Sequence, residues 1–206
     1  IMEEIFGKDF ANMLALLSYQ DLKDEIEWLN SENRSSDTRL RVDLKGRNPD
    51  DGLTGIPYDK GFFLLKLMEE TVGRKEWDNF LKTYFDTFKF KVMTTDSFLA
   101  YLDKELLSKN PELEKAIQPK KWIFEEGLPE NCPKITSTKF ETVEAEIKTW
   151  TDGGAAKEIA SAEWVTPQWL HFINLLNDTL TQAQMAELDE AFGFTQSGNS
   201  EIKAAW

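Results

Sequence analysis

The chain of 206 residues holds 37 acidic and 24 basic side chains, for a net charge of -13. An acidic surface repels phosphate backbones, so nucleic acid is excluded as an expected partner. Hydrophobic residues make up 41% of the sequence, enough to build real cores and to exclude general disorder. No run approaches the roughly 18 apolar residues of a membrane span, and the first residues carry charges where a signal peptide is apolar. We therefore expect a soluble chain without a membrane partner, and a cytoplasmic location is favoured.

The first half of the chain predicts helices joined by short turns. Residues 1–17 place apolar side chains on one face, and Ser18 with Asp21 forms a variant of the capping box before a helix over 18–30. A further helix starts at Pro57 and ends at Gly73. Aromatic residues at helical spacing between 77 and 88 predict the next helix.

Two more features complete this half. Thr95 is expected to cap a helix that begins DSFLAYL. Only TRLRVDL (38–44) looks strand-like, and only weakly. The cations of RLRVDLKGR (39–47) are the one basic cluster, and we interpret them as a solvated strand or loop in preference to a phosphate site.

A break follows at WIFEEGLPENCPK, where Gly127, Pro129 and Pro133 predict a linker over residues 127–134. Short helices are then expected at about 138–150, 167–177 and 181–192, the last closed by a glycine. A cap at Asn199 or Ser200 begins a final short helix. The predicted caps Thr166 and Asn199 bracket one helix pair, a spacing that suits an array of stacked helix pairs.

The composition leaves few ways to build a catalytic centre. The chain has one histidine, His171, and one cysteine, Cys132. A zinc enzyme needs about three protein ligands, so no metal site and no cofactor are expected in this chain. HExxH, GxxxxGK[ST] and GxGxxG are all absent. His171 lies among apolar residues in PQWLHFINLL, which indicates a role in helix packing or at the surface.

The stretch NPDDGLTGIPYDKG (48–61) places Tyr58 at the mouth of a helix, behind a polar loop. A tyrosine hydroxyl keeps its proton at neutral pH and can donate a hydrogen bond to a developing oxyanion. The helix N-terminus adds a weak positive field, and residues 62–65 are expected to anchor the helix in the core. A buried tyrosine bonded to the opposite loop remains an equal alternative. Asp50 and Asp51 could orient a ligand's amine or could simply form the turn.

Several segments, in chain order, resemble the zinc aminopeptidases of the leukotriene hydrolase and aminopeptidase-N type. GIPYDKGFFLLKLMEETVG is similar to the family's P-Y-[ED]-K-G segment, with which Tyr58 aligns. The similarity extends over nearly the whole chain, through IFGKDFANMLALLSYQDLKDEI, KFKVMTTDSFLAYL, WIFEEGLPENCPK and FGFTQSGNSEIKAAW. Collinear matches of this kind are more specific than one tyrosine motif.

The resemblance implies a mainly α fold with two parts. Residues 1–126 would form the C-terminal helical half of a thermolysin-like catalytic domain, 127–134 the linker, and 135–206 the start of a helical-repeat domain. The uncapped start and the short last helix lead us to expect that both ends lie inside a larger protein. The family's HExxH segment would then precede this chain, so the missing N-terminal half of the same protein is an expected partner.

The resemblance also implies an activity: hydrolysis of the first peptide bond of a substrate with a free N-terminus, by a water on zinc. Tyr58 would be catalytic as the oxyanion donor. Asp50 aligns with an acidic residue of the substrate pocket. Leu53 replaces a pocket tyrosine of the leukotriene-processing members, which argues against epoxide hydrolysis. The chain alone is expected to be inactive. Two alternatives stay open: a helical adaptor that has lost the metal site, and a bifunctional aminopeptidase and epoxide hydrolase.

Overall fold

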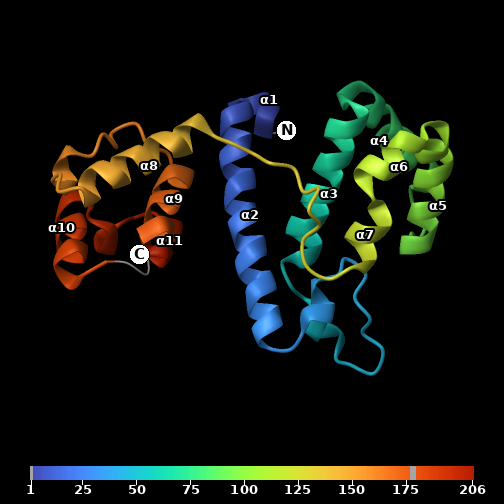
Figure 1. Cartoon of the computed structure of the whole chain (residues 1–206), viewed down its shortest axis with the longest axis horizontal. Coiled ribbons are helices and arrows are strands. Elements are labelled where there is room, and N and C mark those ends of the chain that lie inside the picture. The colour runs from blue at the N-terminus through green and yellow to red at the C-terminus, as the bar shows by residue number, and fades with distance from the viewer. Residues whose placement is uncertain (1, 177–179) are drawn as a thin grey trace. The chain divides into compact units, whose positions relative to one another are not determined.

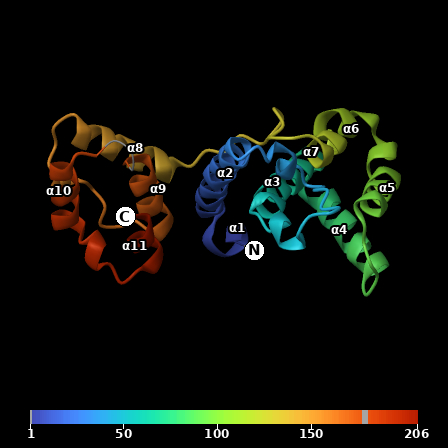
Figure 2. The same cartoon turned by 90° about the horizontal axis from the view of Figure 1, so that it is seen from below.

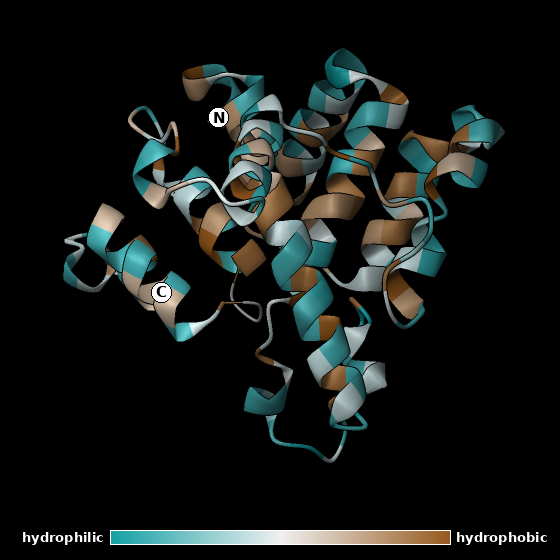
Figure 3. Cartoon of the chain, turned by 60° about the vertical axis from the view of Figure 1, so that its left-hand side comes forward, coloured by the Kyte–Doolittle hydropathy of each residue, from teal (hydrophilic) through white to brown (hydrophobic). Residues whose placement is uncertain are grey.

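The computed structural model describes residues 2–176 and 180–206, and within these the secondary structure is helical, with no strand (Figure 1). The prediction of a mainly α fold is therefore confirmed. The chain separates into two compact units: residues 2–18 together with Ile135–Trp206, and Tyr19–Lys134. Most helices carry both hydrophobic and hydrophilic residues (Figure 3), and many of the hydrophobic ones are buried in the cores.

The unit Tyr19–Lys134 carries the Tyr58 segment. Its helices, in chain order, are α2 (Lys8–Ser31), α3 (Ile56–Val72), α4 (Arg74–Phe88), α5 (Thr95–Glu105), α6 (Pro111–Ile117) and α7 (Pro119–Phe124). The first part of α2 belongs to the other unit. Short 3-10 turns lie in two of the connections: η1 (Ser35–Thr38) and η2 (Pro49–Gly52) between α2 and α3, and η3 (Leu107–Lys109) between α5 and α6. In both views α3 lies beside α4 and α7, so it is the central helix of this unit (Figures 1 and 2).

The limits of α3 follow from the sequence as predicted. Pro57 occupies the first turn, where its missing N–H costs nothing, and Gly73 ends the helix with φ 89°. α4 follows directly and packs on α5 through aromatic rings, with the ring centroids of Phe88 and Tyr101 5.0 Å apart. The cap of α5 is Thr94, one residue before the predicted Thr95, because the Thr94 side chain accepts the N–H of Ser97.

Two predictions for the first 45 residues are wrong. Ser18 does not start a new helix, because α2 runs without a break from Lys8 to Ser31; the break falls at Gly7 (φ 86°), after α1 (Met2–Phe6). Packing on both sides of Ser18, at Met13, Ala15 and Leu22, outweighs the local capping pattern. Of the weakly strand-like residues 38–44, Thr38 ends η1 and the others form a loop, since the structure offers them no neighbouring strand among the residues it describes.

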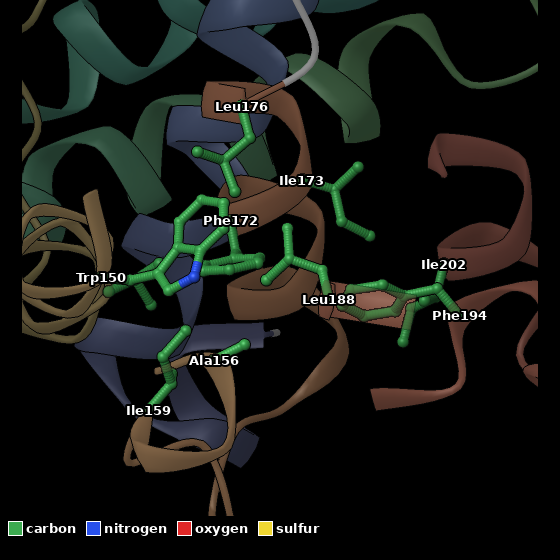
Figure 4. Close-up of a cluster of buried hydrophobic side chains, with 10 residues drawn as sticks. Trp150, Ala156, Ile159, Phe172, Ile173, Leu176, Leu188, Phe194 and Ile202 are labelled. Carbon is green, nitrogen blue, oxygen red and sulfur yellow. The ribbon is translucent and has the colours of Figure 1, made fainter. Parts of the chain in front are cut away.

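The second unit contains α1, the start of α2 and the helices of the C-terminal region. These are α8 (Thr138–Thr151), α9 (Thr166–Leu176), α10 (Gln182–Phe192) and α11 (Ser200–Ala205), with the 3-10 turns η4 (Ala156–Glu158) and η5 (Phe194–Gln196). Residue 177, the predicted end of α9, lies outside the described residues. The core joins all four helices through Trp150, Phe172, Leu188 and Ile202 (Figure 4). Each such side chain contributes roughly 1.5–3 kcal/mol by leaving water.

Helix caps tie this unit together. Thr181 and Gln184 form a full capping box at α10, which ends at Gly193 as predicted. Asn199 caps α11 and also donates from Nδ2 to Oγ1 of Thr166 at the start of α9 (3.0 Å). The two caps predicted from the sequence are therefore in direct contact, and the first turns of α9 and α11 are adjacent.

A carboxylate from α2 caps α8. Ser137 is the N-cap residue of α8 but makes no side-chain capping bond within that helix. Instead, Asp9 Oδ1 accepts the backbone N–H of Thr138 and the hydroxyl of Ser137, both at 3.2 Å. The N-cap function is thus supplied from far away in the sequence. Residues 127–134, the predicted linker, are non-helical, and the division into 1–126 and 135–206 stays a prediction.

Candidate active site

The backbone before Tyr58 is held in place by a carboxylate from α2. The N–H of Gly55, the N-cap residue of α3, donates to Oε1 of Glu25 at 2.9 Å. A Cβ on Gly55 would lie 2.5 Å from Oε2 of Glu25, so any larger residue would force this carboxylate to shift. The start of α3, and with it the Cα of Tyr58, is therefore fixed against α2.

Tyr58 itself is 78% exposed. Among the residues that the structure describes, no hydrogen bond to its hydroxyl occurs, and the alternative of a buried tyrosine bonded to the opposite loop is wrong. The ring stands on the first turn of a 17-residue helix, whose N-terminal dipole favours negative charge nearby. A fixed backbone with a free hydroxyl is the arrangement that a hydrogen-bond donor to a ligand needs.

The anchoring of α3 is only half as predicted. Phe63 and Leu64 are buried, whereas Phe62 and Leu65 are exposed. The reason is the 100° turn per residue, which cannot point four consecutive side chains to one side. Phe63 packs edge-on against Tyr19 of α2, with ring centroids 5.7 Å apart. Tyr58, Phe62 and Leu65 instead share the spacing of one exposed apolar stripe on α3.

Asp50 and Leu53 lie on the loop that leads into α3. Pro49–Gly52 form the turn η2, which Asn48 caps by accepting the N–H of Asp50 (3.2 Å). The prediction of a turn is thus confirmed. The turn does not use the Asp50 carboxylate, which is exposed, and Leu53 is 80% exposed. The two predicted substrate-binding residues and Tyr58 are therefore all accessible on one short stretch of chain.

A buried ion-pair cluster stabilises the loop that carries Asp50 and Leu53. Asp37, only 1% exposed, accepts two hydrogen bonds from Arg47 (2.6 and 2.7 Å) and one from Arg34 (2.9 Å). Arg34 also donates to the backbone carbonyl of Asp51 (2.7 Å), next to Asp50. The bonds from Arg47, opposed by burial and assisted by Arg34, lower the pKa of Asp37 to about 2. This cluster was not predicted from the sequence, which indicated a solvated Arg47.

Lys60 is a second buried charged residue that was not predicted from the sequence. Its side chain is fully buried, although Tyr58 two positions away is exposed. Nζ donates to the backbone carbonyls of Thr38 and Glu125, both at 2.9 Å. Burial lowers the pKa of Lys60 to about 8, with Glu125 opposing the shift. A signal was present: position 60 continues the spacing of the buried residues Ile56 and Phe63.

Carboxylates also gather around the start of α3. Partial burial, followed by the charges of Asp59 and Asp24, raises the pKa of Asp21. These groups do not make a metal centre: within residues 2–176 and 180–206, no group of three His, Cys, Asp or Glu side chains could hold a metal ion. The side chains that the structure describes therefore do not form a donor set that fits the zinc implied by the family resemblance.

The single histidine and the single cysteine lie away from Tyr58 in the sequence and take no part in the site. His171 stacks on Phe140 (ring centroids 3.9 Å apart) and bonds Glu144 through Nε2 (3.0 Å). Burial, opposed by Glu144, lowers its pKa, so the predicted helix-packing role is confirmed. Burial also raises the pKa of Cys132 to about 11, which keeps the thiol protonated.

No helix in the described chain is long and apolar enough to cross a membrane.

Comparison with known proteins identifies the class. Residues 2–119, more than half of the chain, match the peptidase family M1 domain, and the chain belongs to that family. The leukotriene A-4 hydrolase homolog of Botryotinia fuckeliana (strain B05.10) is 26% identical over the whole chain. Leucine aminopeptidase 2 of Lodderomyces elongisporus is 34% identical over 65% of the chain and 21% of its own length.

The fold agrees with this membership. The native leukotriene A4 hydrolase of Saccharomyces cerevisiae matches 99% of the chain with a TM-score of 0.80 at 20% identity, and the match covers 36% of that protein. The chain spans 32% of the length of the Botryotinia relative and 34% of leucine aminopeptidase 2 of Sclerotinia sclerotiorum, which is 26% identical. The fold is thus that of the corresponding third of these proteins.

Proposed function

We propose that this chain is part of a zinc-dependent aminopeptidase that removes N-terminal residues from peptides, and that Tyr58 stabilises the oxyanion of the reaction. The observation that carries the proposal is the pairing of a fixed backbone with a free hydroxyl at Tyr58, in a chain that belongs to peptidase family M1. Residues 1–126 would belong to the thermolysin-like catalytic domain, and residues 135–206 to a helical-repeat domain.

Tyr58 would act by hydrogen bonding. Attack on a peptide carbonyl places negative charge on its oxygen, and a donor that is already oriented stabilises that charge without reorganising. The neutral phenol supplies one O–H donor, and the start of α3 adds a weak positive field at the same place. Glu25, by accepting the N–H of Gly55, keeps the first turn of α3 in position while the substrate binds.

The metal would be held by residues outside this chain. The described residues hold no group that fits zinc, and the chain spans about a third of the relatives it matches. The rest of the same protein is therefore the partner that we propose for this surface. The exposed stripe of Tyr58, Phe62 and Leu65 on α3 supports such a partner, because contiguous exposed apolar residues usually mark a binding face.

Asp50 and Leu53 would shape the substrate pocket. The exposed Asp50 carboxylate can attract the ammonium group of a peptide with a free N-terminus. Leu53 offers an isobutyl group where the leukotriene-processing members of the family resemblance have a phenol, so it can neither donate a hydrogen bond nor act as a nucleophile. We therefore propose peptide hydrolysis without epoxide hydrolysis.

The test uses the complete protein encoded by the reading frame that contains this chain. Tyr58→Phe removes only the hydroxyl, and kcat for an aminoacyl p-nitroanilide should fall about 100- to 1000-fold with little change in KM. Tyr84→Phe, which removes a hydroxyl from the aromatic contact between α4 and α5, is the matched control. An unchanged kcat for Tyr58→Phe would remove this residue from the mechanism.

The same protein separates the alternatives. An upstream HExxH segment is expected, and its absence together with no turnover would identify a helical adaptor instead. Hydrolysis of a lipid epoxide by the wild-type protein would show that Leu53 does not exclude that activity.

A further inference from the structure

Lys60 is a buried cation on α3, two residues after the exposed Tyr58. The side chain of Lys60 has no exposed surface, and its Nζ donates to the carbonyl oxygens of Thr38 and Glu125, each at 2.9 Å. Thr38 ends the turn η1, and Glu125 follows the last residue of α7. A single ammonium group therefore connects α3 to two segments that are distant in the sequence.

The two segments that Lys60 connects are also bonded to each other. The N–H of Gly127 donates to Oγ1 of Thr38 (2.7 Å), and the N–H of Arg41 donates to the carbonyl of Ile123 (3.0 Å). Arg39 and Glu126 form an ion pair at 2.6 Å. These bonds make a frame of residues 38–41 and 123–127, and Lys60 is the link from that frame to the first turns of α3.

The geometry of a helix connects this link to Tyr58. Two residues correspond to about 200° of rotation, so the side chains at 58 and 60 leave α3 on opposite sides. A bond that holds Lys60 to the frame consequently fixes the rotation of the helix start about its own axis. Glu25 fixes the same turn from α2 through the backbone N–H of Gly55.

The choice of lysine is costly for the fold. Position 60 continues a buried apolar face, where a hydrophobic side chain would pack without loss of hydration. Burial depresses the pKa of the ammonium, which shows that the charged form is disfavoured there. A hydrophobic residue would, however, leave the carbonyls of Glu125 and of the buried Thr38 without this donor. The lysine therefore fixes the rotation of the start of α3 about the helix axis, which apolar packing alone would not do.

We propose that Lys60 is a positioning residue that sets the aim of the Tyr58 hydroxyl by bonding the start of α3 to the frame of residues 38–41 and 123–127. This inference deepens the proposed function and rests on it. Lys60 is too deeply buried to touch a substrate, so it acts only through Tyr58.

The experiment is a double-mutant cycle in the complete protein. Lys60→Met, Tyr58→Phe and the double variant are compared with wild type, with kcat counted per active site by titration with a tight-binding inhibitor. Lys60→Met should lower kcat about 10-fold with KM within about twofold, because a small misplacement of a catalytic group costs this order of rate. In the Tyr58→Phe background, Lys60→Met should have no further effect, since the group that it positions is gone.

The matched control is Lys66→Met on the same helix. Lys66 pairs with Glu70 at 3.0 Å on the accessible side of α3, so the substitution removes the same charge without touching the frame. Its kcat should equal that of wild type. If Lys60→Met does not fold, Lys60→Gln, which keeps a shorter donor, takes its place in the cycle and should lower kcat less.

The outcomes separate this inference from the proposed function. If Tyr58→Phe itself leaves kcat unchanged, the proposed function fails. If Tyr58→Phe lowers kcat but the Lys60 variants match wild type per active site, the positioning role alone is wrong. Equal fold-losses for Lys60→Met with and without the Tyr58 hydroxyl would likewise overturn it, because they indicate a general structural effect.

Discussion

At the scale of single residues, the structure shows two buried charges that were not predicted from the sequence. Asp37 and Lys60 are nearly or fully inaccessible to solvent. Asp37 is paired with two guanidinium groups, whereas Lys60 bonds only backbone carbonyls. Their pKa values are therefore both lowered, for opposite reasons: the charged form is stabilised at Asp37 and destabilised at Lys60.

The first prediction concerns Asp37 at low pH. Because its pKa is lower in the folded chain than in the unfolded chain, its stabilising effect is present above about pH 4 and is lost as the pH falls toward 2. The free energy of unfolding of wild type should exceed that of Asp37→Asn by about 2 kcal/mol at pH 6. Urea unfolding of both proteins between pH 6 and pH 2.5 should show this difference shrinking. A difference that does not depend on pH would contradict the ion-pair assignment.

The second prediction concerns Lys60 at high pH, where stability should again rise with pH because the pKa is again lower in the folded chain than in the unfolded chain. Between about pH 8 and pH 10.5 the unfolded lysine holds a proton that the folded one has released, so stability rises with pH through this window. The free energy of unfolding of wild type, minus that of Lys60→Met, should increase by about 2–3 kcal/mol across it. Lys66→Met, measured in the same way, should show no such increase.

At the scale of elements, some helix starts are held by their own caps and others by contacts from elsewhere in the chain. α10 has a capping box written into its own sequence. The capping bond at the start of α8 comes from Asp9 on α2, and Glu25 on α2 bonds the N-cap residue of α3. The boundaries of α10 could accordingly be predicted, whereas the bonds from Asp9 and Glu25 depend on residues that meet only after folding.

The third prediction concerns the end of α8. A Cβ on Gly154 would lie 2.9 Å from the backbone oxygen of Thr149, which cannot move without disturbing the helix end. Gly154→Ala should therefore destabilise the C-terminal unit by about 1–3 kcal/mol in thermal unfolding. Gly198→Ala is the control, because nothing lies within 4 Å of its Cβ position. Equal stability of the two variants would show that the α8 end relaxes freely.

At the scale of the whole chain, the residues predicted to matter for catalysis lie in one unit, Tyr19–Lys134. That unit supplies an oriented phenol and an exposed carboxylate but no metal ligand set among its described residues. Activity is accordingly expected only when the rest of the protein is present.

The fourth prediction tests this directly. The 206-residue chain, loaded with zinc and passed through a desalting column, should retain far less than one zinc per chain and hydrolyse no aminoacyl p-nitroanilide. The physical reason is that the described part of the chain brings no three suitable ligands together. Zinc bound tightly at one per chain, together with turnover, would show that the active centre is complete in this chain.

By itself, the sequence determined the helical class, the limits of α3 and α10, the turn before Tyr58 and the resemblance to the zinc aminopeptidases, because all of these are recorded in local spacing, caps and motifs. The tertiary structure decided the rest. It made α2 continuous through Ser18, exposed Phe62 and Leu65, buried Lys60 and Asp37, and left Tyr58 free. These outcomes depend on which distant segment packs against each residue, since burial and hydrogen-bond partners arise only when segments such as 38–41 and 123–127 meet.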